Sequence, residues 1–158
     1  MPLSACGCGA GAQTNETDVR RAADGLVSSG MRAAGYRALS LDGGWWGGGK
    51  SGKVRRNASG YITVNDTKFP SSGVGGNGPG LLPLSRYITA RGFLFGHYTS
   101  ADAVMCSKDV GGSGGNEEKD AALFASWNIS LMKLDDCKHC RYLLLPTHCR
   151  CCSQDALA

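Results

Sequence analysis

The sequence predicts an α/β protein built on a parallel sheet, and three observations support this fold class. Segments with helical and strand-like patterns alternate along the chain, in the order helix, strand, helix, strand, helix, strand. The expected strands are short apolar runs, as in sheets that are buried on both faces. Two of these runs, at residues 36–42 and 129–135, stop at an aspartate. Polar groups at the carboxyl ends of parallel strands are where such proteins keep their chemistry.

The first expected helix begins near Asn15, which can cap it and is followed by an acidic first turn. Its apolar residues recur at helical spacing and are Val19, Ala22, Ala23, Leu26 and Val27. Gly30 can end the helix in a left-handed conformation. The strand at residues 36–42 follows. Residues 43–80 are rich in Gly, Ser, Asn and Pro, and therefore predict a long loop of the kind that is functional or inserted.

The second half of the chain predicts two further helix and strand pairs. A short helix has an apolar stripe formed by Leu81, Leu84, Tyr87 and Ile88. Gly92 can end this helix, and the strand at residues 93–98 follows. Asn116 and two glutamates begin a helix that runs to Trp127. Asn128 tolerates the left-handed turn that leads into the last strand.

Composition sets the outer limits of the interpretation. The chain has 158 residues, of which 42% are hydrophobic and 19% charged, which is typical of about one globular domain. Its net charge of +4 is scattered, and the only adjacent basic pairs are Arg20-Arg21 and Arg55-Arg56. No aromatic residues are interleaved with them, so nucleic acid is not an expected partner. No apolar segment approaches the length of a membrane span, so no membrane association is expected.

The cysteines and glycosylation sequons bear on the cellular compartment. There are eight cysteines, crowded toward the carboxyl end, which is a density typical of oxidised, secreted proteins. Four N-glycosylation sequons begin at Asn15, Asn57, Asn65 and Asn128. Residues 1–11 nevertheless show no apolar core of a secretion signal. These observations point in opposite directions and leave the compartment open.

The sequence resembles a known family over most of its length. Residues 35–45, which read GYRALSLDGGW, are similar to the signature of the melibiase-type α-galactosidases, glycoside hydrolase family 27. The similarity continues in the same order through residues 91–98, 106–108 and 124–127 into residues 133–137. The resemblance implies a (β/α)8 TIM barrel, of which this chain would hold about three strands with their helices. It also implies enzymes that are usually secreted, vacuolar or lysosomal.

The resemblance assigns roles to four side chains. Asp135 matches the catalytic nucleophile of a retaining hydrolysis of terminal α-D-galactosyl residues, through a covalent glycosyl-enzyme. Lys133, two residues earlier on the same strand face, matches a lysine that binds the sugar hydroxyls. Asp42 and Tyr98 match further substrate-binding residues. The implied partners are α-galactoside oligosaccharides or glycoconjugates, and neither a cofactor nor a metal is implied. The choice between galactose and N-acetylgalactosamine is left open.

The resemblance also implies a disulfide between Cys106 and Cys137, and the chain departs from the family at several points. Gly43 and Gly44 replace the second aspartate and the cysteine of the usual Asp-Asp-Cys-Trp run. The opening strand of the family has no expected counterpart in residues 1–14. The family's general acid/base aspartate comes from a later strand than the nucleophile, and nothing after Cys137 resembles that half. The chain is therefore expected to be inactive alone.

The predicted organisation is an irregular leader at residues 1–14, a partial barrel at 15–137 and a Cys-rich tail at 138–158 without family resemblance. Two alternatives from other classes compete with the glycosidase. Residues 44–51 match the phosphate-binding pattern G-x-x-x-x-G-K-[ST], which would make Lys50 and Ser51 nucleotide ligands, although the following residues do not predict a helix. The tail could instead bind zinc through Cys137, Cys140, His148, Cys149, Cys151 and Cys152.

Overall fold

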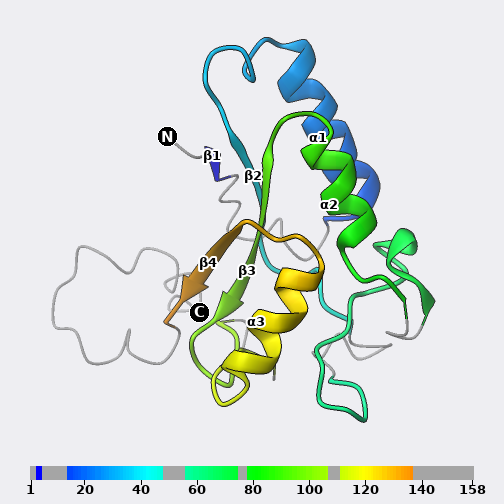
Figure 1. The fold of residues 1–158 in the computed structure, drawn as a ribbon, viewed down its shortest axis with the longest axis vertical. Coiled ribbons are helices and arrows are strands. Elements are labelled where there is room, and N and C mark those ends of the chain that lie inside the picture. Colours follow the sequence, from blue (N-terminus) through cyan, green and yellow to red (C-terminus); the bar gives the residue numbers. More distant parts are fainter. Residues whose placement is uncertain (1–2, 5–13, 48–55, 75–77, 107–110, 137–158) are drawn as a thin grey trace, which may run out of the picture.

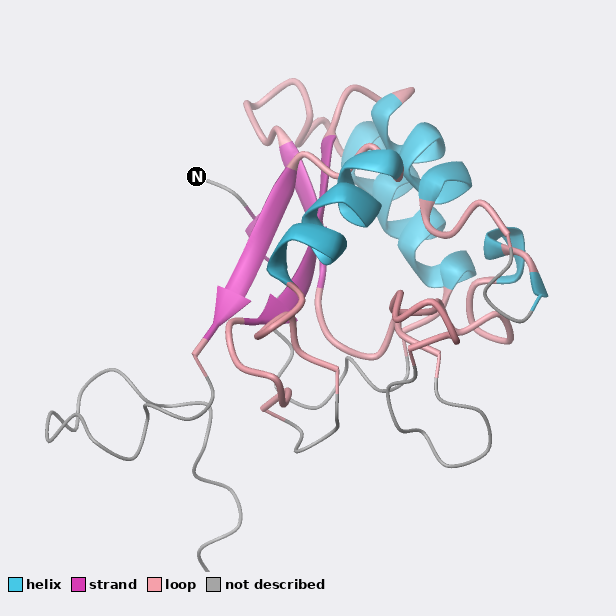
Figure 2. Ribbon diagram, turned by 60° about the horizontal axis from the view of Figure 1, so that its bottom comes forward, coloured by secondary structure: helices cyan, strands magenta, loops and turns pink. Residues whose placement is uncertain are grey.

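A computed structural model of the chain describes residues 3–4, 14–47, 56–74, 78–106 and 111–136. These residues form a four-stranded parallel sheet in the order β1-β2-β3-β4. The strands are β1 (Leu3–Ser4), β2 (Ala38–Leu41), β3 (Leu94–Ser100) and β4 (Leu131–Asp135). The helices are α1 (Glu16–Ser28), the short 3₁₀ helix η2 (Pro70–Ser72), α2 (Leu82–Thr89) and α3 (Glu117–Ser126). The elements alternate along the chain, and the described helices lie on one side of the sheet (Figures 1 and 2).

Local signals explain where α1 begins and where the three α-helices end, as the sequence predicted, whereas the side chain of Asn116 makes no capping hydrogen bond at the start of α3. The side chain of Asn15 caps α1, because its Oδ1 accepts a hydrogen bond of 3.0 Å from the backbone N–H of Asp18. Left-handed backbone follows each helix, with φ of 77° at Gly30, 80° at Gly92 and 57° at Asn128. The expected alternation of helices and strands from residue 15 to residue 135 is confirmed. The fold is an open part of a barrel wall with its helices on the outer side.

The leader contains one element that the sequence did not predict. Leu3 and Ser4 pair in parallel with Leu39 and Ser40 of β2. The expectation that residues 1–14 are wholly irregular and lack an opening strand is therefore wrong at these two positions. Two residues are too few to show an alternating pattern, so only their pairing with β2 reveals a strand. Residues 5–13 lie outside the described part of the chain.

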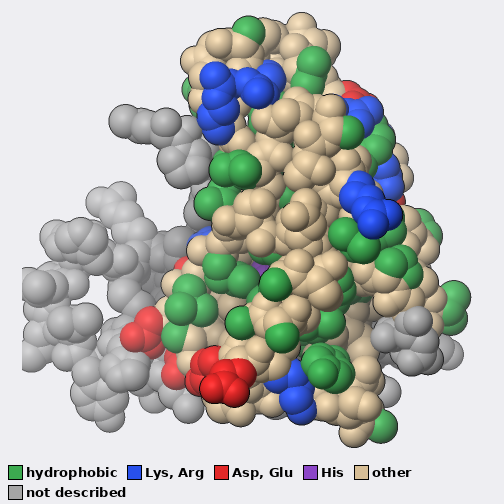
Figure 3. Space-filling model, viewed as in Figure 1, with side chains coloured by type: hydrophobic (Ala, Val, Ile, Leu, Met, Phe, Trp, Pro, Cys, Tyr) green, Lys and Arg blue, Asp and Glu red, His purple; other side chains and the backbone are tan. Residues whose placement is uncertain are grey.

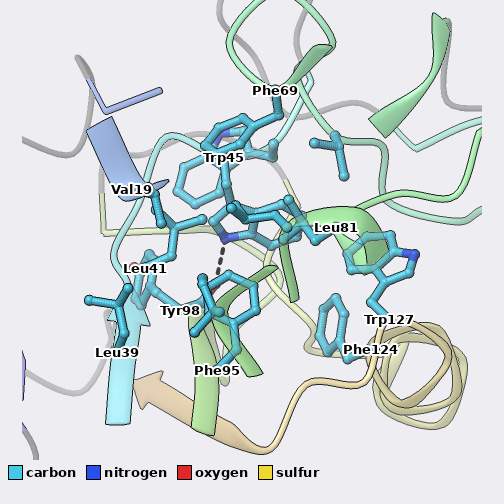
Figure 4. Close-up of a cluster of buried hydrophobic side chains, with 14 of the residues drawn as sticks. Val19, Leu39, Leu41, Trp45, Phe69, Leu81, Phe95, Tyr98, Phe124 and Trp127 are labelled. Atoms are coloured by element: carbon cyan, nitrogen blue, oxygen red, sulfur yellow. Dashed lines mark hydrogen bonds between the residues drawn. The ribbon is translucent and has the colours of Figure 1, made fainter. Parts of the chain in front are cut away.

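An aromatic core fills the space between the sheet and its helices. Trp45, Phe95 and Ile88 are fully buried, and Phe124 and Trp127 bring α3 into the same cluster. Figure 4 shows this cluster, with Trp45 at its centre. Trp45 belongs to the long loop predicted at residues 43–80, so the first part of that loop is core rather than surface. Burial of this apolar area stabilises the fold.

The long loop is also attached to α3 by a buried ion pair. The guanidinium of Arg56 binds both carboxylate oxygens of Asp120, at 2.6 and 2.7 Å. Arg56 also donates to the backbone carbonyls of Gly60 and Gly112, each at 3.0 Å. Asp120 is 1% exposed. Such a pair withstands burial because its hydrogen-bonding groups are satisfied.

Strand β4 is not buried, although its apolar run predicted a strand that is buried on both faces. Met132 and Leu134 are 41% and 59% exposed, whereas β2 and β3 are mostly buried. Figure 3 shows uncovered hydrophobic side chains on this face, and acidic side chains near the end of β4 and the start of α3. β4 is the outer strand of the described sheet, so no described strand pairs with its free edge. The sequence shows that a run is apolar, but it does not show whether another strand or helix covers that run.

Candidate active site

Asp42, Tyr98, Lys133 and Asp135 lie together at the carboxyl ends of three neighbouring strands. Nζ of Lys133 lies 3.1 Å from Oδ2 of Asp42 and 3.5 Å from Oδ2 of Asp135. The same nitrogen lies 5.0 Å from the centroid of the Tyr98 ring, within cation–π range. One ammonium group therefore bridges two carboxylates beside an aromatic ring. The structure brings together all four side chains that the resemblance proposed for catalysis and substrate binding.

The strand register produces this arrangement. Tyr98 of β3 is the register partner of Lys133 of β4, so their side chains lie on the same face of the sheet. Lys133 and Asp135 are two residues apart on one strand and share that face. Asp42 follows the last residue of β2, and its Oδ1 accepts a hydrogen bond of 2.7 Å from the N–H of Gly43. That bond orients the carboxylate toward the lysine.

Two tryptophans hold Tyr98 in place. The indole Nε1 of Trp45 donates a hydrogen bond of 2.9 Å to the backbone carbonyl of Tyr98, which Figure 4 marks with a dashed line. The ring of Trp46 lies 6.0 Å from the Tyr98 ring, at an angle of 46°. Burial raises the pKa of the Tyr98 phenol, so the hydroxyl stays protonated at neutral pH. It can therefore donate a hydrogen bond to a ligand.

Gly43 shows how the site differs from the family pattern of two adjacent aspartates. A Cβ atom at Gly43 would lie 3.1 Å from Cη2 of Trp46 and 3.7 Å from the Tyr98 ring. Trp46 thus occupies the space into which a side chain at position 43 would extend. Neither tryptophan is among the site residues expected from the sequence. Trp45 ends the run of residues that resembles the family signature, and this position is the signal that could have identified it.

Cys106 lies next to Asp135, the last residue of β4. Its Sγ lies 4.0 Å from Oδ2 of Asp135. Cys106 is disulfide-bonded, whereas its predicted partner Cys137 lies outside the described residues. The pairing of Cys106 with Cys137 therefore stays a prediction. A disulfide at Cys106 would restrain the loop that borders the nucleophile position.

The site is open to solvent. The side chains of Asp42, Lys133 and Asp135 are 26%, 32% and 35% exposed. Charged groups of this kind can accept and donate hydrogen bonds to neighbouring hydroxyls of a sugar. Within the described ranges, no group of three or more His, Cys, Asp or Glu side chains could hold a metal ion. No helix in the described parts of the chain is long and apolar enough to cross a bilayer.

The two alternative hypotheses fall largely outside the described residues. Lys50 and Ser51, the proposed nucleotide ligands, lie in the gap at residues 48–55. The preceding tryptophans of the same motif, Trp45 and Trp46, are 0% and 7% exposed, so they pack in the core instead of forming an open phosphate loop. The zinc hypothesis rests on residues 137–158, which are also outside the described part.

Comparisons with known proteins agree on one family. Residues 6–147 match the family model described as alpha galactosidase A. Alpha-galactosidase 2 of Arabidopsis thaliana is 36% identical over 125 residues, which are 79% of this chain and 28% of that protein. Alpha-galactosidase A of Aspergillus niger is 37% identical over 123 residues, which are 78% of this chain and 20% of that protein.

Solved structures lead to the same family. Alpha-galactosidase I from Mortierella vinacea superposes with a TM-score of 0.68 at 30% identity, over 80% of this chain and 28% of that one. The alpha-galactosidase of Saccharomyces cerevisiae, solved with raffinose, has a TM-score of 0.66 at 28% identity, over 78% of this chain and 24% of that one. The chain thus spans less than a third of the length of these relatives. They support neither the nucleotide-binding nor the zinc-binding alternative.

Proposed function

We propose that this chain, which belongs to the alpha galactosidase A family, contributes the nucleophile side of an active site for terminal α-D-galactosyl residues. The observation that carries the proposal is the position of Lys133 between Asp42 and Asp135. Asp42 follows β2, and Lys133 and Asp135 belong to β4, which β3 separates from β2. The three side chains meet toward the carboxyl ends of these parallel strands, where barrel enzymes hold their substrates. The yeast relative was solved with raffinose, an α-galactoside, which supports an oligosaccharide of this class as the substrate.

In the proposed reaction, a carboxylate oxygen of Asp135 attacks the anomeric carbon of the galactosyl group. The bond from that carbon to the leaving oxygen breaks, and a covalent glycosyl-enzyme forms. Water then displaces Asp135, so the sugar keeps its anomeric configuration. Lys133 orients the nucleophile through its 3.5 Å contact and can donate to a sugar hydroxyl. Asp42 accepts hydrogen bonds from sugar hydroxyls, and the Tyr98 ring borders the bound sugar.

The protonation of the leaving oxygen is the step that the described residues do not account for. The resemblance assigns the general acid to a later strand than β4, in the part of the relatives that this chain does not span. General acid catalysis typically contributes about 10²–10⁴ in rate. The chain by itself should therefore be inactive on ordinary galactosides, as expected from its sequence, and could act only on activated substrates whose leaving group departs without protonation.

Leaving-group dependence tests this proposal on the intact chain. α-Galactosyl fluoride and 2,4-dinitrophenyl α-galactoside need little help from an acid, whereas methyl α-galactoside needs it fully. We expect release of fluoride and dinitrophenolate, and no detectable methanol. Asp135→Asn should abolish the release. Glu118→Gln, an exposed carboxylate outside the site, is the matched control and should leave it unchanged.

Two positive results would overturn the assignment. One is fluoride release that is equal in the chain and in Asp135→Asn, because the nucleophile would then be another group. The other is equal release from α-glucosyl fluoride, which would show that the site does not recognise galactose. Absence of release from every galactoside would also contradict the proposed role, provided that circular dichroism shows a folded chain.

A further inference from the structure

Four asparagines in the described part of the chain stand in N-glycosylation sequons, but their structural environments differ. Oδ1 of Asn15 caps α1 and its Nδ2 donates a hydrogen bond of 2.7 Å to Asp18. Oδ1 of Asn57 accepts from two backbone N–H groups, at 3.1 and 2.9 Å. Oδ1 of Asn65 accepts from the N–H of Lys68 at 3.1 Å. All three side chains are partly buried and organise a helix end or a turn.

Asn128 is different, because its side chain is exposed and makes no hydrogen bond with the described residues. It lies in the turn between α3 and β4, with φ of 57°. Its backbone is fixed on both sides, since its N–H donates to the carbonyl of Ala125 at 2.9 Å and its carbonyl accepts from Oγ of Ser85 at 3.0 Å. The amide group is thus presented to solvent from a fixed position.

We propose that Asn128 is the N-glycan acceptor of this chain when it passes through the secretory pathway. The donor is an oligosaccharide linked to a polyisoprenyl diphosphate. Nδ2 of Asn128 bonds to the anomeric carbon of the reducing-end N-acetylhexosamine and loses a proton. The bond from that carbon to the diphosphate oxygen breaks, and its electron pair leaves with the diphosphate. This modification is independent of the proposed hydrolysis.

A glycan at Asn128 is compatible with the candidate active site. Asn128 precedes β4, whereas the proposed nucleophile Asp135 is the last residue of that strand. Five strand residues span about 16 Å. The sugar would therefore extend from the opposite end of the sheet. A glycan on Asn15, Asn57 or Asn65 would instead have to be accommodated at a side chain that already holds a helix end or a turn.

The third residue of the sequon offers the cleanest test, because Asn128 itself also serves the left-handed turn. Ser130→Ala removes the sequon and leaves Asn128 unchanged, whereas Ser130→Thr keeps the sequon. The full chain carrying a secretion leader would be expressed in a eukaryotic host. The soluble secreted protein would be treated with peptide-N-glycosidase in ¹⁸O water, and the converted asparagines mapped by mass spectrometry.

We expect conversion at Asn128 in a larger fraction of molecules than at Asn15, Asn57 or Asn65. Ser130→Ala should lose this conversion, and Ser130→Thr should retain it. Higher occupancy at any of the other three sequons would overturn the proposal, as would an absence of glycan from secreted protein. Persistence of the Asn128 conversion in Ser130→Ala would show that the signal is spontaneous deamidation, and would also overturn it.

Discussion

His97 is a fully buried histidine whose protonation should weaken the fold in acid. Neither ring nitrogen has a hydrogen-bond partner within the described residues. The ring packs against Trp45 and Phe124, with centroid distances of 4.8 and 4.2 Å. Burial lowers the pKa of His97 from 6.5 to about 4, and the negative charge of Asp120 only partly opposes this shift. The negative charge of Asp120 is balanced by its ion pair with Arg56.

The sign of the effect follows from the order in which the two states bind a proton. In the unfolded chain, a histidine titrates near its ordinary pKa of 6.5, so the unfolded state is protonated first as the pH falls. The contribution of neutral His97 is complete above pH 6.5. It is lost between pH 6.5 and about 4, the pKa of the folded state. At 1.36 kcal/mol per pKa unit, the loss amounts to ~3 kcal/mol.

Urea unfolding between pH 7.5 and pH 4 measures this loss. His97→Phe keeps an aromatic ring against Trp45 and Phe124, but this ring cannot be protonated. The exposed carboxylates titrate in both proteins, so their effects cancel in the difference between the two pH profiles. We expect the wild-type chain to lose ~3 kcal/mol more than the variant over this range. Parallel profiles would refute the assignment of the acid sensitivity to His97.

Two further substitutions test the packing around the site. Asp120→Asn leaves the partly buried guanidinium of Arg56 without its charge partner and should lower the free energy of unfolding by about 3–5 kcal/mol. Arg21→Ala, which breaks an exposed ion pair, should cost less than about 1 kcal/mol. Gly43→Asp places a Cβ 3.1 Å from the Trp46 ring and should cost about 1–3 kcal/mol, measured by thermal or urea unfolding.

Each of these has a clear opposing result. If Asp120→Asn were no more costly than Arg21→Ala, the pair would not be the attachment of the long loop to α3. Unchanged stability in Gly43→Asp would mean that Trp46 moves aside without loss. The pocket could then accept the second carboxylate of the family pattern.

Much of the fold was predictable because its signals are local. The cap at Asn15, the left-handed residue at Gly30 and the alternation that puts Lys133 and Asp135 on one face can each be recognised within a few neighbouring residues. The proximity of Asp42 to Lys133 could be expected only from a parallel sheet, which the alternation of helices and strands predicted.

The remaining features depend on contacts between distant residues. Arg56 and Asp120 are 64 positions apart, and neither position carries a pattern that predicts the pair. His97 is a polar residue in a short strand, and only the positions of Trp45 and Phe124 show that its ring is buried. The exposure of β4 likewise depends on which elements surround it, which an apolar run does not report.

Covalent labelling of Asp135 tests the central claim most directly. An α-galactosyl fluoride that carries a further fluorine on the sugar ring needs no acid to form a glycosyl-enzyme. That glycosyl-enzyme hydrolyses slowly, so it can be detected. Peptide mapping of the intact chain should find one galactosyl adduct, on Asp135, and Asp135→Asn should carry none. Lys133→Met should slow the labelling, because the nucleophile loses its 3.5 Å contact. An adduct on another residue, or no adduct on a folded chain, would contradict the assignment of Asp135 as the nucleophile.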